Sequence, residues 1–203
     1  MKYGILAALA ITAFLNPAPA ADVSSVGPEE IRDFDSNPEP VRKLLLAALS
    51  LTKRDLGYQY ASADPSRGGM DCSGTIYYLL NEQGIADVPR SSDQQYAWAV
   101  EKTTFHPVKS STINDTEFAE LRPGDLLFWT GTYAIQRKVP VTHVMIYLGE
   151  AARDGRRLMV GASDGRTYRG EKKYGVSVFD FRMPAAESRS LFIGYARVPG
   201  LGE

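Results

Sequence analysis

The sequence predicts an α+β fold, in which N-terminal helices pack on a central antiparallel β-sheet. Apolar residues in the first half of the chain recur at three- and four-residue spacing, which is the period of a helix. The second half carries short β-branched or aromatic runs, separated by Gly, Pro or charged turns. Helices followed by strands are typical of an α+β domain.

Length and composition predict one domain. The 203 residues are 44% hydrophobic, which suits one substantial core and leaves little room for a second. We assign residues 1–20 to a signal peptide, 21–40 to an extended lead-in and 41–203 to a single domain. Lys and Arg total 23 against 24 for Asp and Glu, so no overall field favours nucleic acid, and we expect no such partner.

Residues 1–20 have the three parts of a secretory signal. Lys2 supplies positive charge, an apolar stretch runs from Ile5 to Leu15, and Ala18-Pro19-Ala20 offers small residues for cleavage. The alternative is a buried N-terminal helix, but the run is too short to span a bilayer and two prolines would break it. We therefore expect a mature chain that starts near Ala21, has no integral membrane segment, and is exported to the periplasm, the cell wall or the exterior.

Three helices are expected, in order, in the first half. Apolar spacing predicts the first over Val41 to Lys53, and a loop rich in Gly, Ser, Pro and Tyr follows from Gly57 to Gly69. The second begins at Cys72 and stops at Gly84. A third is expected over Ser92 to Val100.

Five strands are expected in the second half, where period-two or continuous apolar runs are bounded by turn residues. Their ranges are Asp125–Thr130, Val141–Gly149, Arg157–Ala162, Tyr174–Phe179 and Leu191–Val198. Alternation along the second of these places His143 on the face of Val141, Met145 and Tyr147.

Cys72 is the only cysteine of the chain, so it cannot form an internal disulfide. Asp71 precedes it as a suitable N-cap, which puts the sulfur at a helix N-terminus, where partial positive charge lowers a thiol pKa. Gly74 would let another backbone approach closely. A small buried hydrophobe is the alternative interpretation of a lone cysteine.

Histidine is the usual base for a cysteine nucleophile, because its pKa lies near neutrality. Only two are available: His106, beside Pro107, is interpreted as a solvated loop residue, whereas His143 lies in an apolar strand. A hydrogen-bonded core histidine is the alternative for His143. Two histidines and one cysteine, widely spaced, argue against a zinc site, and we expect no metal.

Four stretches follow one another in a recognisable order, and a fifth, Val88–Gln95, lies among them. The four are Leu56-Gly57-Tyr58-Gln59-Tyr60, Asp71-Cys72-Ser73-Gly74, Arg122–Trp129 and Thr142–Gly149. Together they resemble the NlpC/P60 family of papain-like cysteine peptidases. Any one motif is weak, but five in the right order are specific.

The resemblance implies a papain-like fold over residues 41–203 and cleavage of amide bonds in peptidoglycan stem peptides by a monomer that needs no cofactor. It implies Cys72 as nucleophile and His143 as base. It places five residues on the substrate side: Tyr60, Asp71, Ser73, Arg90 and Ser91. Arg90 could hold a stem-peptide carboxylate, and Tyr60 could donate to the oxyanion beside the Cys72 N–H. A solvated surface arginine is the alternative for Arg90.

The chain departs from the family pattern on the strand after His143. The family has a third polar residue there, which orients the imidazole, but this chain has Gly161. Ser163 is the first substitute and Asp164 the second, although both are also common turn residues. The following stretch, Asp164–Tyr174, could border the groove or form a solvated hairpin loop.

This departure keeps two alternative functions open. One is a catalytically weak wall-binding module with the same fold. The other is a related amidase or acyltransferase that uses the same Cys/His pair.

Overall fold

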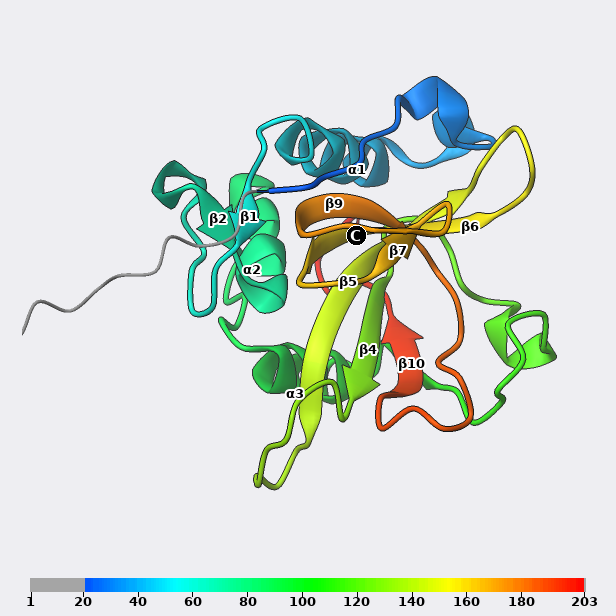
Figure 1. The fold of residues 1–203 in the computed structure, drawn as a ribbon. Helices are drawn as coiled ribbons and strands as arrows, with labels where there is room; N and C mark the ends of the chain where they lie inside the picture. Colours follow the sequence, from blue (N-terminus) through cyan, green and yellow to red (C-terminus); the bar gives the residue numbers. More distant parts are fainter. Residues whose placement is uncertain (1–20, 203) are drawn as a thin grey trace, which may run out of the picture.

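A six-stranded antiparallel sheet in the order β3-β10-β4-β5-β6-β9 forms the centre of the protein (Figure 1). The computed structural model describes residues 21–202, so the predicted signal peptide at 1–20 lies outside the described residues. The strands are β3 (Phe105–Pro107), β4 (Leu126–Thr130), β5 (Val141–Glu150), β6 (Arg157–Ser163), β9 (Gly175–Asp180) and β10 (Leu191–Ala196). All five predicted strands are confirmed, within a few residues at their ends.

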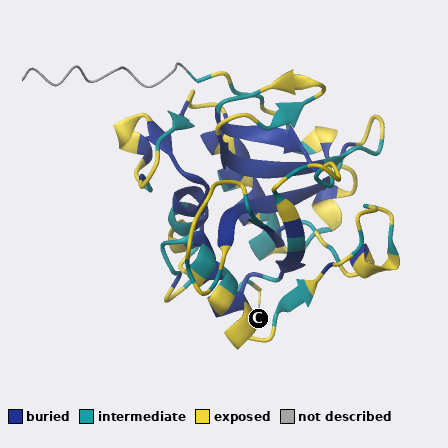
Figure 2. Ribbon diagram, turned by 60° about the horizontal axis from the view of Figure 1, so that its bottom comes forward, coloured by how far each residue is buried: buried dark blue, intermediate teal, exposed yellow. Residues whose placement is uncertain are grey.

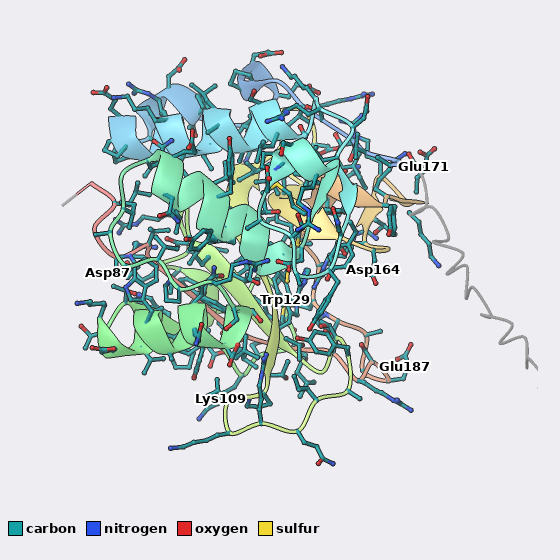
Figure 3. The ribbon with its side chains drawn as sticks, turned by 90° about the vertical axis from the view of Figure 1, so that its left-hand side faces the viewer. Asp87, Lys109, Trp129, Asp164, Glu171 and Glu187 are labelled. Carbon is teal, nitrogen blue, oxygen red and sulfur yellow. The ribbon has the colours of Figure 1, made fainter. Side chains whose placement is uncertain are left out.

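Three helices cover one face of this sheet: α1 (Glu39–Leu51), α2 (Cys72–Glu82) and α3 (Ser92–Glu101). Figure 3 shows them one above another with the strands behind. The larger apolar core fills the space between the helices and the sheet, and Leu44, Ile76 and Val144 are among its fully buried members. The predicted α+β architecture of helices on an antiparallel sheet is confirmed.

A second apolar cluster lies on the other face of the sheet. It includes Trp129, Met145, Phe179 and Tyr195, and a short 3-10 helix, η4 (Thr116–Phe118), contributes Phe118 to it. With both faces covered, the central strands are buried along most of their length (Figure 2). This explains why they read as continuous apolar runs.

The first residues of β5 do not follow the alternation of faces that holds along the rest of the strand. Val144, Ile146 and Leu148 contact the helix-side core, whereas Met145 and Tyr147 belong to the opposite cluster. The register with β4 shifts between Trp129↔His143 and Thr130↔Val141, and this irregularity turns Val141 to the helix side. The prediction that Val141 shares the face of His143 is therefore wrong.

His106 is not the solvated loop residue that we expected. It lies in edge strand β3, which pairs with β10, and its ring stacks on Tyr195 with centroids 5.1 Å apart. We expected a loop here because of Pro107, but proline is tolerated at the end of an edge strand.

The segment before α1 runs beside the sheet. It contains two 3-10 turns, η1 (Pro28–Glu30) and η2 (Phe34–Ser36), and buries Val26, Ile31 and Phe34. The Ser24 hydroxyl donates to the Val178 carbonyl of β9 at 2.6 Å. The segment is thus joined to the core of the domain.

Small elements interrupt the loops. They are β1 (Gly57–Tyr58), which pairs in parallel with β2 (Gly69–Met70), the turn η3 (Pro65–Arg67), and a hairpin of β7 (Thr167–Tyr168) with β8 (Glu171–Lys172). Within residues 21–202, no helix has the length and apolar character needed to cross a membrane.

Candidate active site

Helix α2 begins at Cys72, and Asp71 caps it as predicted. The Asp71 Oδ1 atom accepts the Gly74 backbone N–H at 2.6 Å, which satisfies one of the free donors of the first turn. The absence of a side chain at Gly74 is required, because a Cβ there would lie 2.1 Å from the Ser62 carbonyl oxygen. The loop before α2 therefore packs directly on the turn that carries the sulfur.

Strands β5 and β6 are no longer paired at the place where the first turn of α2 packs on the sheet. The pairing of β5 with β6 begins at the Glu150 end and reaches only Ile146↔Val160, whereas β6 stays paired with β9 as far as Ser163↔Gly175. The Tyr147 N–H points to β4, where it bonds Asp125 O, so by alternation the Val144 N–H points to the β6 side. Beyond Ile146, that amide is free to meet the helix.

The Cys72 sulfur occupies this opening. Backbone hydrogen bonds from Val144, the neighbour of His143, and from Ser73 reach the sulfur and favour its thiolate form. Burial of the side chain and the nearby Asp71 carboxylate oppose them and raise the pKa of the thiol to about 11. The helix N-terminus therefore does not lower the Cys72 pKa as we expected, because burial outweighs it.

His143 lies one residue before the amide that meets the sulfur, and its side chain is only 6% exposed. Its Nε2 atom accepts a hydrogen bond from the Nε–H of Arg166 at 3.2 Å. The Arg166 guanidinium also lies over the Trp129 ring, 4.2 Å from its centroid. Burial and the adjacent guanidinium together hold the pKa of His143 well below its ordinary value.

Arg166 thus takes the place where we predicted Ser163 or Asp164. Ser163 is buried at the end of β6, and Asp164 is exposed. The space above Gly161 is filled by the Met145 side chain, whose Cε would lie 3.2 Å from an added Cβ. The imidazole is therefore met by a hydrogen-bond donor from the loop after β6.

Arg90 is not a solvated surface residue, because two neighbouring side chains engage its guanidinium. Its Nη2 donates to Asp71 Oδ2 at 2.8 Å, and its Nη1 donates to Asp71 Oδ1 and to the Ser73 hydroxyl, each at 3.1 Å. A buried glutamine in α3, Gln95, holds the Ser73 carbonyl from the same side at 3.0 Å. These contacts fix the first turn of α2 from the α3 side.

Two hollows flank the Cys72–Val144 contact. The first, of about 270 Å³, is lined by five predicted site residues and by Cys72: Tyr60, Asp71, Cys72, Ser73, Arg90 and Ser91. Tyr60 is 77% exposed at its rim. These six predicted residues therefore lie together at one hollow, and their roles in binding or catalysis stay a prediction.

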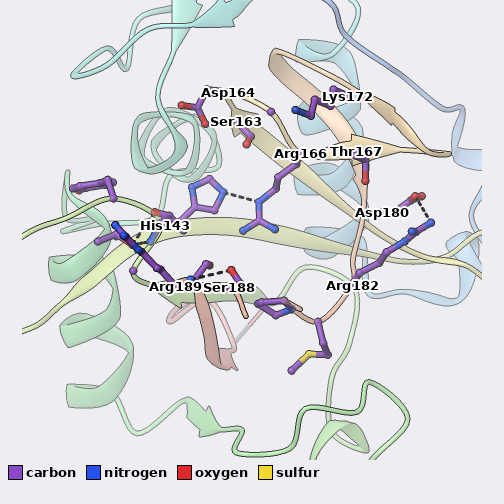
Figure 4. A pocket seen from close by; sticks show the side chains of 18 of the residues that line it. His143, Ser163, Asp164, Arg166, Thr167, Lys172, Asp180, Arg182, Ser188 and Arg189 are labelled. Atoms are coloured by element: carbon purple, nitrogen blue, oxygen red, sulfur yellow. Dashed lines mark hydrogen bonds and ion pairs between the residues drawn. The ribbon is translucent and has the colours of Figure 1, made fainter. Parts of the chain in front are cut away.

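The second hollow, of about 740 Å³, opens beside His143. Its lining includes Ser163, Asp164, Arg166 and Lys172 from the end of β6 and the stretch beyond it (Figure 4). Tyr58, Tyr133 and Thr142 line both hollows, which therefore adjoin, and we call the two together the groove.

Sequence reasoning missed Arg166 and Tyr58 as site residues. The composition of the Asp164–Tyr174 stretch, rich in Gly, Arg, Lys and Tyr, was the one signal that pointed to the groove. Tyr58 lies beside the expected Tyr60 in the same motif, and nothing in the spacing distinguishes the half-buried tyrosine from the exposed one.

A cysteine that opens a helix, packed against a histidine-bearing strand of an antiparallel sheet, defines a papain-like α+β protein. The chain belongs to the NlpC/P60 family, whose sequence pattern matches residues 56–170, more than half of its length. The matched region contains both Cys72 and His143, together with Arg166.

Comparison with known proteins gives two curated relatives. The chain is 27% identical over 117 residues to the murein DD-endopeptidase MepH of Escherichia coli (strain K12), covering 57% of this chain and 37% of that protein. It is 32% identical over 93 residues to the gamma-DL-glutamyl hydrolase of Bacillus subtilis (strain 168), covering 45% of this chain and 18% of that protein. The chain therefore spans well under half the length of these relatives.

A solved structure supports the fold. It is the crystal structure of a protein described as similar to lipoprotein, NLP/P60 family, from Staphylococcus aureus subsp. aureus Mu50. The TM-score is 0.50 at 25% identity, and the match covers 80% of this chain and 42% of that one.

Proposed function

We propose that this protein is an exported cysteine hydrolase that cleaves amide bonds in peptidoglycan stem peptides, with Cys72 as nucleophile and His143 as base. The observation that carries the proposal is the hydrogen bond between the Cys72 sulfur and the backbone of Val144, the neighbour of His143, at a place where one hollow is lined by Cys72 and the other by His143. Nucleophilic catalysis by a thiol requires a base within reach, which is the role proposed for His143.

The reaction would proceed in two steps. His143 takes the Cys72 thiol proton while the sulfur attacks the amide carbonyl carbon. The tetrahedral intermediate then loses its amine, which leaves with the proton from His143. Water next attacks the thioester, with His143 taking one proton and returning it to the leaving Cys72 sulfur. A carboxylic acid and an amine are the products.

The first hollow supports a role in stabilising the oxyanion. The Cys72 backbone N–H lies in the first turn of α2, where no helical carbonyl accepts it. Tyr60 at the rim carries an exposed hydroxyl that can reach a bound substrate. Both are donors of the kind that stabilise a developing oxyanion. The Arg90–Asp71 pair would keep this turn rigid and leaves Ser91 to contact the peptide.

The relatives support the substrate class. One is named for cleavage of murein and the other for cleavage of γ-glutamyl bonds. Because the first name specifies murein, a peptidoglycan stem peptide is the substrate proposed for this chain.

A wall-binding module with little catalytic power is a second candidate. It is favoured by one observation: the resting site holds a buried thiol with a raised pKa and an imidazole bound to a cationic donor. A thiolate-imidazolium pair is disfavoured in that arrangement.

Digestion of purified peptidoglycan, followed by mass spectrometry of the products, separates the two candidates. The hydrolase predicts new amino and carboxyl ends, which disappear in Cys72→Ala and His143→Ala but persist in the surface control Arg54→Gln. Retention on peptidoglycan without new ends in the wild type would instead establish the binding module. Because transfer to an amine gives no free carboxyl, the same spectra identify an acyltransferase.

Export has its own test. The full chain, expressed in a bacterium, should be recovered outside the cytoplasm with an N-terminus at Ala21. Recovery from the cytoplasm with residues 1–20 intact would contradict this part of the proposal.

A further inference from the structure

The hydrogen bond between Arg166 and His143 fixes where the imidazole proton lies. A guanidinium has only donors, so the Nε2 atom must present its lone pair to Arg166. A neutral imidazole with a free Nε2 lone pair carries its proton on Nδ1. Neither ring nitrogen is then available to take a proton from Cys72, because one is protonated and the other is engaged.

Protonation of His143 would also break this contact. An imidazolium carries N–H groups on both nitrogens, so its Nε2 would face the Arg166 donor with no lone pair between them. Burial lowers the pKa of the Arg166 guanidinium only to about 10, so it remains charged at neutral pH. His143 therefore cannot act as a base until Arg166 leaves Nε2.

The hollow beside His143 offers Arg166 another class of partner. Four cationic side chains line it, Arg166, Lys172, Arg182 and Arg189, against two carboxylates, Asp164 and Asp180. Asp180 already pairs with Arg182 at 3.0 Å and with Arg156 at 3.4 Å. Within the described part of the chain, neither Lys172 nor Arg189 has an ion-pair partner.

Figure 4 shows the Arg166 guanidinium directed at the imidazole, with Lys172 and Arg189 on opposite sides of the same hollow. Other titratable groups near this contact are Cys72 from α2, Tyr58 from β1 and Asp164 from the loop after β6. The excess of cations makes this half of the groove suitable for an anion.

We propose that Arg166 is a positioning residue with two alternative partners. In the free protein it holds Nε2 of His143, and in the complex it pairs with a carboxylate that the substrate places in the cationic hollow. Transfer of the guanidinium to that carboxylate releases the imidazole and lets it accept the Cys72 proton. Anionic peptides would thus be both the preferred ligands and the trigger of the base.

This inference rests on the proposed hydrolase function and adds the condition under which its base becomes available. A γ-linked glutamyl bond leaves the α-carboxylate of the glutamate free beside the bond to be cut. A planar carboxylate matches the guanidinium fork, which binds it through two parallel hydrogen bonds. A neutral, amidated peptide cannot make this exchange with Arg166.

Nitrogen NMR of the imidazole tests the free state directly. With 15N-labelled histidine, the His106→Gln variant reports His143 alone, since the chain has two histidines. We expect the neutral form with its proton on Nδ1 at pH 7. Arg166→Met keeps an unbranched side chain over Trp129 and removes the hydrogen-bond donor. In this variant the titration midpoint of His143 should rise toward that of free histidine. A wild-type imidazole with its proton on Nε2 would overturn the proposal without any need for the variant.

Ligand binding tests the exchange. In a Cys72→Ala background, which prevents turnover, the probe is γ-D-glutamyl-L-alanine with free carboxylates, compared with its carboxamide form. The carboxylate peptide should bind about tenfold more tightly, and it should raise the His143 midpoint, whereas the carboxamide should leave that midpoint unchanged. Arg189→Gln should weaken binding but keep the Nδ1 proton of the free protein, and Arg54→Gln should change neither. Equal binding of the two peptides would refute the proposal.

The two proposals can fail separately. If the protein cleaves peptidoglycan but the NMR signal of His143 does not change with the carboxylate peptide, the proposed exchange of Arg166 is disproved and the proposed hydrolase function is retained. A His143 signal that responds to the peptide, in a protein that cuts no bond, would disprove the hydrolase and keep the exchange.

Discussion

Arg90 binds both carboxylate oxygens of Asp71, the residue that caps the helix on which Cys72 lies. The Asp71 side chain is 8% exposed and that of Arg90 is 35% exposed, so this pair is more shielded from water than most surface ion pairs. A planar fork meets a planar carboxylate here, and lysine cannot reproduce that geometry.

Replacement of Arg90 by lysine should therefore lower the free energy of unfolding by about 1 kcal/mol, because at least one charge-assisted hydrogen bond is lost. Urea denaturation measures the change. Arg122→Lys is the matched control, since its pair with Glu120 is exposed and should contribute about 0 to 0.5 kcal/mol. Equal effects of the two variants would contradict the structural role of the Arg90–Asp71 pair.

Gly74→Ala should destabilise the protein although alanine is the better helix former. The added Cβ would lie 2.1 Å from the Ser62 carbonyl oxygen and 2.9 Å from the Asp71 Oδ1 atom, so the loop or the cap must move. We expect a loss of about 2 kcal/mol or more, measured by chemical denaturation. Ser50→Ala on the exposed side of α1 should change stability by less than about 0.5 kcal/mol. A stabilised Gly74→Ala variant would show that the close approach of the loop is absent.

Alkylation of Cys72 should be slow at neutral pH in the free protein. Burial and Asp71 raise the pKa of this thiol to about 11, and the thiolate is the reactive form. The rate with iodoacetamide should thus rise about tenfold per pH unit from pH 7 to 9 and show no plateau there. Because Cys72 is the only cysteine, mass spectrometry of the intact protein measures the alkylated fraction directly. A plateau below pH 8 would instead indicate a preformed thiolate.

Acid should destabilise the fold through His143. Its pKa in the folded protein lies well below 6.5, so the unfolded chain binds the proton more readily. Stability is therefore lost as pH falls below about 6.5, at up to about 1.4 kcal/mol per pH unit. Between pH 6.5 and 5.5, the wild type should lose about 1 kcal/mol more than His143→Gln. Arg54→Gln, which alters an exposed residue of the turn after α1, should follow the wild type. Parallel curves for all three proteins would exclude a buried neutral His143.

Periodicity and capping predicted most of the fold. The apolar spacing from Val41 located α1, and the Asp71–Gly74 signal located the start of α2. Alternation assigned Val144 and Met145 to opposite faces of β5 correctly. These features depend on residues that are close together in the sequence, so the sequence alone predicts them.

The rest depends on contacts between distant segments. The register shift that turns Val141 arises from the pairing of β5 with β4, and the position of Arg166 arises from a loop that folds back over Trp129. The direction of the Cys72 pKa shift followed from burial, which outweighed the helix N-terminus. Proximity in space decided each of these outcomes, and spacing along the chain does not record it.

The opening between β5 and β6 has a consequence for protein engineering. A ladder that continued through Val144 would use up the amide that meets the sulfur and would seal the surface on which chemistry is proposed. Transfer of this reactive pair to another helix-on-sheet scaffold therefore needs more than a cysteine and a histidine at the right separation. The scaffold must also have an interrupted sheet, in which one strand diverges so that a backbone N–H remains free to meet the introduced cysteine.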